Sequence, residues 1–170
     1  MTKPPILKSR TGRRYREEHT EAVAMTAMIQ RLRSIQFKNF ITLQRGFDLP
    51  RKDMEIGPYP VIGSTSTIGY HNDFKVEPPG VITGRSGSLG TVQYVTTRYW
   101  PHNTALWVKD FKGNHPRYVY YFIQTLNLEH FNSGVGVPTL NRNDLDTLEI
   151  KIHPEPIQRK IAEVCQRMTI

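Results

Sequence analysis

The stretch GVITGRSGSLG (residues 80–90) sets three glycines at a spacing of three around Arg85. A phosphate-binding P-loop needs Lys and Ser/Thr after its last glycine, and a dinucleotide fingerprint needs G-x-G-x-x-G at the start of a helix. Neither pattern fits, because TVQYV (91–95) follows and predicts a strand. We therefore predict a glycine turn between two strands, where glycine accepts a positive φ. Arg85 would face either a phosphate or an internal carboxylate.

Short apolar segments on both sides of this turn indicate further strands. Gly, Pro, Asn and Ser separate these segments, which are YPVIG (59–63), GVITG (80–84), GTVQYVTT (90–97), ALWVKD (105–110) and LEIKI (148–152). Twelve glycines and twelve prolines argue for many turns and against a helical bundle. The sequence predicts an α+β fold, a curved, mostly antiparallel sheet domain with a few helices.

Three segments before the C-terminus predict helices. The spacing of Met, Ile and Leu favours a helix over residues 17–34. A long apolar run predicts a buried helix over residues 115–128, with Pro116 in its first turn. Residues 138–148 predict a second, short helix with Asn141 as its N-cap.

The segment PEPIQRKIAEVCQRMTI (154–170) predicts a short, coiled-coil-like C-terminal helix. Its apolar residues recur at spacings of four, three and four, the pattern of an a/d seam: Ile157, Ile161, Val164 and Met168. We predict that this seam packs against a partner helix. The alternative is a helix that docks on its own domain.

The positive charge of the chain lies near its beginning. The formal net charge is +8; residues 1–54 hold 12 Lys/Arg and 5 Asp/Glu, whereas residues 55–170 hold 11 and 10. This asymmetry favours a polyanionic partner, most simply nucleic acid, and a solvated basic tail is the alternative. No apolar run approaches the roughly 20 residues that cross a bilayer, so no membrane partner is expected. The single Cys165 fits a reducing cytoplasm.

The sequence patterns for catalysis are weak. Glu149 and Lys151 match the end of a metal-dependent nuclease pattern, and Asp110 can be nominated as its further acid. The same pair also arises on the water-facing side of any alternating strand. The histidines lack paired metal-ligand spacing, and no serine or cysteine has an evident base partner. We predict a binding protein with no catalytic residue and no metal, and the nuclease remains the alternative.

Six segments, read in order, resemble the specificity subunit of type I restriction–modification systems. They are RGFDLP (45–50), GPYPVIGSTSTIGYHNDF (57–74), GVITGRSGSLGTVQYV (80–95), HNTALWV (102–108), GVPTLNRNDLDTLEIKI (136–152) and PEPIQRKIAEV (154–164). The resemblance implies a DNA target recognition domain over residues 36–153 and the start of a spacer helix over 154–170. Residues 1–35 form a basic extension outside it.

The resemblance also implies the partners of the chain. Specificity subunits direct a modification subunit, which binds S-adenosylmethionine, and a restriction subunit, which uses ATP and Mg, to double-stranded DNA. This chain would be a non-catalytic component with no cofactor of its own. A single recognition domain implies a half-subunit that pairs as a homodimer, a truncated gene product or an excised fragment. An assembly module that does not read DNA is a further alternative.

The candidate DNA contacts are polar residues in or beside the predicted loops. For phosphates we nominate the cations Arg45, Arg51, Lys52, Lys75 and Arg98, together with Arg85 in the glycine turn. For base edges or the groove we nominate short donors and acceptors between the 59–63 strand and HNDF: Ser64, Thr65, Thr67, His71 and Asn72.

Overall fold

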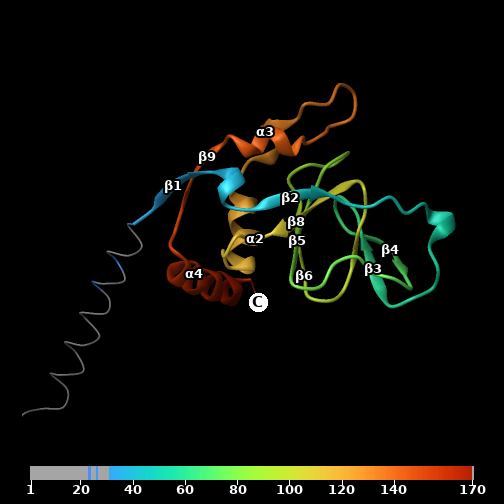
Figure 1. The fold of residues 1–170 in the computed structure, drawn as a ribbon, viewed down its shortest axis with the longest axis horizontal. Helices are drawn as coiled ribbons and strands as arrows, with labels where there is room; N and C mark the ends of the chain where they lie inside the picture. The colour runs from blue at the N-terminus through green and yellow to red at the C-terminus, as the bar shows by residue number, and fades with distance from the viewer. Residues whose placement is uncertain (1–22, 24–25, 27–30, 170) are drawn as a thin grey trace, which may run out of the picture.

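The computed structural model describes residues 23, 26 and 31–169 and has the mixed α+β architecture that the sequence predicts (Figure 1). Within this part of the chain nine short strands form three sheets, almost all of whose neighbours are antiparallel. Most of the helix expected over residues 17–34 lies outside the described residues. No described helix has the length and apolar character needed to cross a membrane.

The central sheet has four strands, in the order β2 (Thr42–Arg45), β8 (Ala105–Asp110), β5 (Gly80–Gly84) and β6 (Val92–Val95). A three-stranded sheet lies beside it, with β3 (Tyr59–Ile62) between β4 (Thr67–His71) and β7 (Trp100–Pro101). Its β3 and β7 are parallel, whereas β3 and β4 form an antiparallel hairpin. In Figure 1 this small sheet lies on the right and the longer helices lie on the left.

The helices are short, and the one over Pro116–Thr125 packs against β5 and β6 of the central sheet. They are α2 (Pro116–Thr125), α3 (Arg142–Asp146) and α4 (Glu155–Met168), with 3-10 turns η1 (Phe37–Asn39), η2 (Arg51–Asp53) and η3 (Leu128–Phe131). The predictions of α2 with Pro116 in its first turn and of α3 are confirmed. The predicted N-cap is also confirmed, because the Asn141 side chain accepts a hydrogen bond from the Asn143 backbone N–H at 3.1 Å.

Strand β5 is buried along its whole length because both of its faces are covered. Val81 packs in the main core with Val119 and Ile123 of α2. Ile82 points the other way and packs against Tyr99 in a second cluster beside the small sheet. A strand covered on both faces is apolar throughout. The burial of both Val81 and Ile82, whose side chains point to opposite faces, therefore reflects the central position of the strand.

The glycine turn after β5 is confirmed. It joins β5 to β6, which pair antiparallel, and Gly87 and Gly90 have φ values of +88° and +87°. Side chains rarely adopt this region, so glycine at both positions allows the chain to turn. The turn is therefore a corner of the sheet, without the following helix that a nucleotide-binding loop would need.

The predicted helix over residues 17–34 is wrong at its C-terminal end. Ser34 belongs to strand β1 (Arg33–Gln36), which pairs antiparallel with β9 (Glu149–Ile152) and places Ser34 opposite Lys151. This pairing joins residues more than a hundred positions apart. A local spacing rule cannot detect it, so the apolar spacing before Ser34 extended the predicted helix too far.

Candidate nucleic-acid interface

The β3–β4 hairpin separates the predicted base contacts into two groups. Thr67 pairs with Ile62 at the turn of the hairpin, whereas His71 pairs with Tyr59 at its open end. Four steps along a strand span about 13 Å. Ser64, Thr65 and Thr67 thus lie near the turn, and His71 and Asn72 lie at the other end.

At the turn, Ser64 connects the hairpin to two other loops. Its hydroxyl lies 2.8 Å from the Ser86 carbonyl oxygen and 2.9 Å from the Thr104 carbonyl oxygen, so its hydrogen is used inside the protein. Thr65 and Thr67 are exposed. Of the three predicted residues here, these two threonines present their hydroxyl groups to solvent.

Arg85 lies close to this turn, and its surroundings answer the question raised by the sequence. Its Nη1 donates to the Asn103 carbonyl oxygen at 3.4 Å, and its backbone N–H donates to the Thr104 carbonyl oxygen at 2.9 Å. Within residues 31–169 no ion pair involves Arg85. Among residues 31–169, the Arg85 guanidinium is therefore held by a carbonyl oxygen and not by an internal carboxylate, which was one of the two alternatives from the sequence.

Arg45 at the end of β2 lies in the same neighbourhood. It forms an exposed ion pair with Asp48 at 3.3 Å, and the Asn103 side-chain amide donates to the same carboxylate. An exposed pair of this kind contributes about 0–1 kcal/mol. Arg45 can therefore exchange Asp48 for another anion at little cost.

An open cavity of about 710 Å³ joins these loops. Its polar lining comes from three separated parts of the chain and includes Gln44, Arg45, Arg85, Ser133, Asn141 and Arg142. The lining contains three guanidinium groups and no Asp or Glu. Arg45 pairs with Asp48, which does not line the cavity, whereas no ion pair within residues 31–169 involves Arg85 or Arg142. These two unpaired cations make the cavity suited to an anion.

Sequence analysis did not nominate Arg142 for DNA contact. Its Nη1 donates to the Leu43 carbonyl oxygen at 3.3 Å, a residue 99 positions away. The cue available in the sequence was an arginine directly after the N-cap Asn141, at a helix start where the helix dipole favours an acid. No spacing rule relates residues 45, 85 and 142, so their convergence was not predictable.

The open end of the hairpin carries a different arrangement of cations. Lys75 pairs with Asp73 at 3.3 Å and lies 4.5 Å from the centre of the Trp100 ring. Arg98 pairs with Glu77 at 3.0 Å, and the hydrogen bond to that carboxylate raises the pKa of Arg98. Both cations are exposed but already have acidic neighbours. A phosphate would have to compete with these carboxylates.

The two predicted base contacts at this end also have internal partners. His71 is only 8% exposed, and its Nδ1 accepts a hydrogen bond from the Glu55 backbone N–H at 3.1 Å. The exposed Asn72 donates its side-chain amide to the Glu55 carboxylate. Both residues therefore hold the segment around Glu55 against the hairpin.

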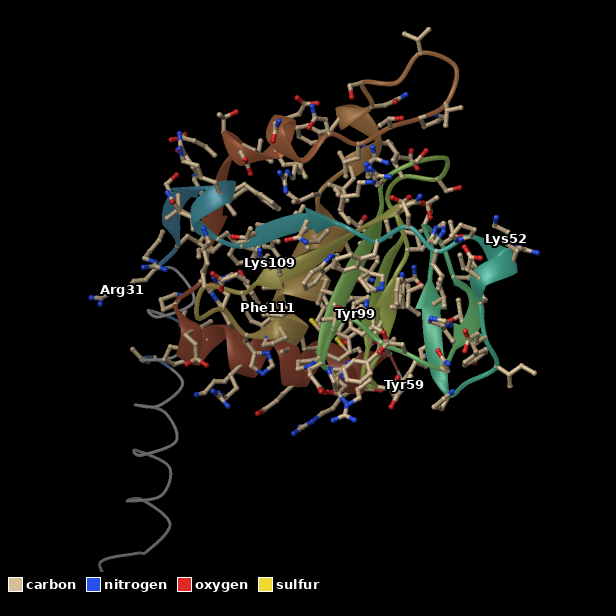
Figure 2. The ribbon with its side chains drawn as sticks, turned by 45° about the vertical axis from the view of Figure 1, so that its right-hand side comes forward. Arg31, Lys52, Tyr59, Tyr99, Lys109 and Phe111 are labelled. Carbon is tan, nitrogen blue, oxygen red and sulfur yellow. The ribbon has the colours of Figure 1, made fainter. Side chains whose placement is uncertain are left out.

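Arg51 and Lys52 lie in the segment that leads to Met54 and Glu55, which contact Gly69 of β4 and His71. They occupy the 3-10 turn η2 and are exposed. Figure 2 shows Lys52 at the outer edge of the molecule, far from Lys109 of β8. The eleven predicted contacts therefore form no single patch. The turn of the hairpin and the cavity gather Arg45, Arg85 and the two exposed threonines.

The predicted seam of α4 divides into a buried part and an exposed part. Ile157 is 1% exposed, and Ile161 packs on the main core. Val164 and Met168 are 55% and 82% exposed. The first half of the seam docks on its own domain, whereas the second half is available to another surface.

Sequence analysis overlooked Gln158, which connects α4 to the domain. Gln158 is 1% exposed; its Oε1 accepts from the His115 backbone N–H, and its Nε2 donates to Asn114 Oδ1 and to the His153 carbonyl oxygen. The signal available in PEPIQRKIAEV was that Gln158 directly follows Ile157, an apolar residue of the predicted seam. The bonds to Asn114 and His115 join α4 to the start of α2, and the bond to His153 closes the turn that precedes α4.

The nuclease alternative lacks the arrangement that it requires. Its two acids should lie on neighbouring strands, but Asp110 ends β8 of the central sheet, whereas Glu149 begins β9, which pairs with β1. Across the described residues, no three His, Cys, Asp or Glu side chains gather in a group that could hold a metal ion. Glu149 and Lys151 are exposed on an alternating strand.

Comparisons with known proteins agree on one family. The family model described as type I restriction modification DNA specificity domain matches residues 33–169. A search of curated proteins found no match. Among solved structures, the S subunit of a type I restriction–modification system from M. genitalium is similar with a TM-score of 0.68 at 18% identity, over 78% of this chain and 37% of that one.

Two further solved structures are similar over 94% of this chain. The HsdS subunit from Thermoanaerobacter tengcongensis has a TM-score of 0.61 at 15% identity, with 46% of that chain covered. A structure concerned with complex assembly and conformational transition of the type I R-M system has a TM-score of 0.65 at 16% identity, with 47% covered. At such identities the likeness concerns the fold. This chain spans less than half the length of these three relatives.

Proposed function

The chain belongs to the family of type I restriction modification DNA specificity domains, a non-catalytic family, and from this premise we propose that it binds double-stranded DNA at a specific sequence. The cavity lined by Arg45, Arg85 and Arg142 is the observation that carries the proposal. Two of these guanidinium groups have no acidic partner within residues 31–169, and the third has only an exposed ion pair with Asp48, so they suit the phosphate backbone, which supplies most of the affinity in protein–DNA complexes.

We assign sequence reading to the turn of the β3–β4 hairpin. Thr65 and Thr67 are exposed there, and Ser64 ties this turn to the carbonyl of Ser86, the residue next to Arg85. Threonine can hydrogen-bond to base edges and can contact the methyl group of thymine. The remaining cations, Arg51, Lys52, Lys75 and Arg98, would contact phosphates further along the duplex.

The proposed partners follow from the family. The chain would direct a modification subunit and a restriction subunit to their DNA site, and S-adenosylmethionine, ATP and Mg would be bound by those subunits. The exposed half of the α4 seam, Val164 and Met168, supports contact with another helix, either in a partner subunit or in a second copy of this chain. Through this contact the chain would assemble with another protein chain.

A selection from random duplexes tests the proposal directly. The chain is incubated with the duplex pool, alone and with the modification subunit, and the bound fraction is sequenced. We expect enrichment of a short motif, and we expect Thr67→Ala to relax the preference at one position. Thr97→Ala serves as the matched control, because Thr97 is exposed in the loop after β6.

The outcomes separate the candidate functions. Failure to enrich any motif in either condition would contradict sequence-specific binding. Binding to the modification subunit without any DNA binding at low salt would favour an assembly module. Cleavage of DNA in Mg²⁺ that Glu149→Ala abolishes would favour the nuclease.

A further inference from the structure

We propose that Arg85 and Arg142 form a clamp for one phosphodiester of the DNA backbone in the cavity. The inference rests on the proposed DNA binding and adds a defined contact to it. It assigns a ligand to Arg142, which sequence analysis did not nominate, and distinguishes this pair from the other exposed cations of the chain.

The partners of these two guanidinium groups are backbone carbonyl oxygens. Arg85 donates to the Asn103 carbonyl oxygen, and Arg142 donates to the Leu43 carbonyl oxygen. A guanidinium carries five N–H donors, so each bond orients the group and leaves other donors unused. A carbonyl oxygen also leaves the positive charge unneutralised. Lys75 and Arg98, in contrast, lie against Asp73 and Glu77.

Backbone hydrogen bonds join the turn that carries Arg85 to the loop that ends at Arg142. The Leu140 backbone N–H donates to the Arg85 carbonyl oxygen at 2.8 Å, and the Gly87 backbone N–H donates to the Pro138 carbonyl oxygen at 2.9 Å. The loop that ends at Arg142 is thus bonded to the turn that holds Arg85. Pre-formed donors bind an anion with a smaller loss of conformational entropy.

The loop between η3 and α3 is also braced internally. The Asn132 side-chain oxygen accepts from the backbone N–H groups of Gly134 and Thr139, at 3.0 and 2.9 Å. A Cβ at Gly134 would lie 2.0 Å from the Val137 carbonyl oxygen, so the loop closes tightly there. Figure 1 shows this orange loop projecting from the body of the protein above α3. A loop that projects in this way can lie against a DNA strand.

The cavity is large enough for a phosphate group and has donors besides the arginines. A volume of about 710 Å³ falls within the range of ligand-binding pockets, about 300–1,000 Å³, and leaves room for a phosphate with its sugars. Gln44 and Asn141 add uncharged amide donors on the lining, whereas the Ser133 hydroxyl donates to the Thr139 carbonyl oxygen at 3.2 Å. Arg45 can also contact the phosphate when its ion pair with Asp48 breaks. Anionic phosphate oxygens match this donor set.

The salt dependence of binding to a duplex of arbitrary sequence tests the clamp. Each phosphate contact contributes about 0.9 to the slope of log K against log salt. We expect Arg142→Gln and Arg85→Gln each to reduce the steepness of this slope by about one and to weaken binding similarly on all sequences. Arg159→Gln is the matched control, because Arg159 is exposed on α4 and pairs with Glu155. Circular dichroism verifies that each variant is folded.

Three results would overturn the inference in distinguishable ways. A wild-type chain that binds no duplex at low salt would refute the proposed function and the clamp together. Wild-type binding with equal slopes for Arg142→Gln and Arg159→Gln would refute the clamp alone. Binding of millimolar inorganic phosphate that Arg142→Gln abolishes, with no effect on duplex binding at constant ionic strength, would assign the cavity to a free anion instead of the DNA backbone.

Discussion

Replacement of Gln158 by leucine should destabilise the protein by about 3 kcal/mol. The substitution keeps the side-chain volume and the helix propensity similar. It removes three hydrogen bonds from a residue that is 1% exposed and leaves the His115 N–H and the His153 carbonyl without these partners. Each lost bond costs about 0.5–1.5 kcal/mol, and each buried orphan group costs about 1–3 kcal/mol. The apolar gain of leucine offsets part of this sum.

Urea denaturation followed by circular dichroism measures the change in the free energy of unfolding. For a domain of this size, about 3 kcal/mol corresponds to a fall of roughly 6–12 °C in Tm. Gln166→Leu is the matched control, because Gln166 is exposed on the same helix and should change stability by less than about 0.5 kcal/mol. Equal stability of the two variants would refute the idea that Gln158 anchors α4.

Three further predictions concern the seam, the cavity and pH. Ile157→Ala should cost about 2–4 kcal/mol in urea denaturation, whereas Met168→Ala should cost less than about 0.5 kcal/mol, because Ile157 is 1% and Met168 82% exposed; equal effects would contradict the division of the seam. Asp48→Asn should tighten duplex binding up to about fivefold at low salt by freeing Arg45, and the gain should vanish in high salt; unchanged anisotropy titrations at low salt would contradict it. Burial lowers the pKa of His115, so the unfolded chain binds more protons there and stability should fall as pH drops below about 6.5. His115→Asn should flatten that part of the pH profile, and an unchanged profile would remove His115 as its source.

Local sequence patterns predicted much of the fold correctly. Strands β5 and β8 were predicted at their observed bounds, and the glycines at positions 87 and 90 marked a turn with positive φ. Asn141 was predicted as an N-cap and acts as one. These features depend on residues within a few positions of one another, where side-chain chemistry and backbone geometry limit the choices.

Features that depend on distant residues were not accessible in this way. The helix predicted up to Ser34 gave way to β1, because its partner strand β9 begins at Glu149. The predicted seam of α4 looked uniform, but the packing of the domain buries Ile157 and leaves Met168 exposed. A hydrophobic repeat identifies an apolar face without identifying the surface that covers it.

The candidate site also combines features that local sequence predicts with features that depend on distant residues. Residue type and loop position nominated Arg45 and Arg85 as phosphate contacts, and six ordered segments indicated the family. The association of these two arginines with Arg142, and the separation of Thr67 from His71, required the three-dimensional structure. Strand pairing and loop-to-loop hydrogen bonds bring together residues separated by 40 to about 100 positions. No periodicity within a short window encodes such contacts, so the cavity emerges only when the whole chain is folded.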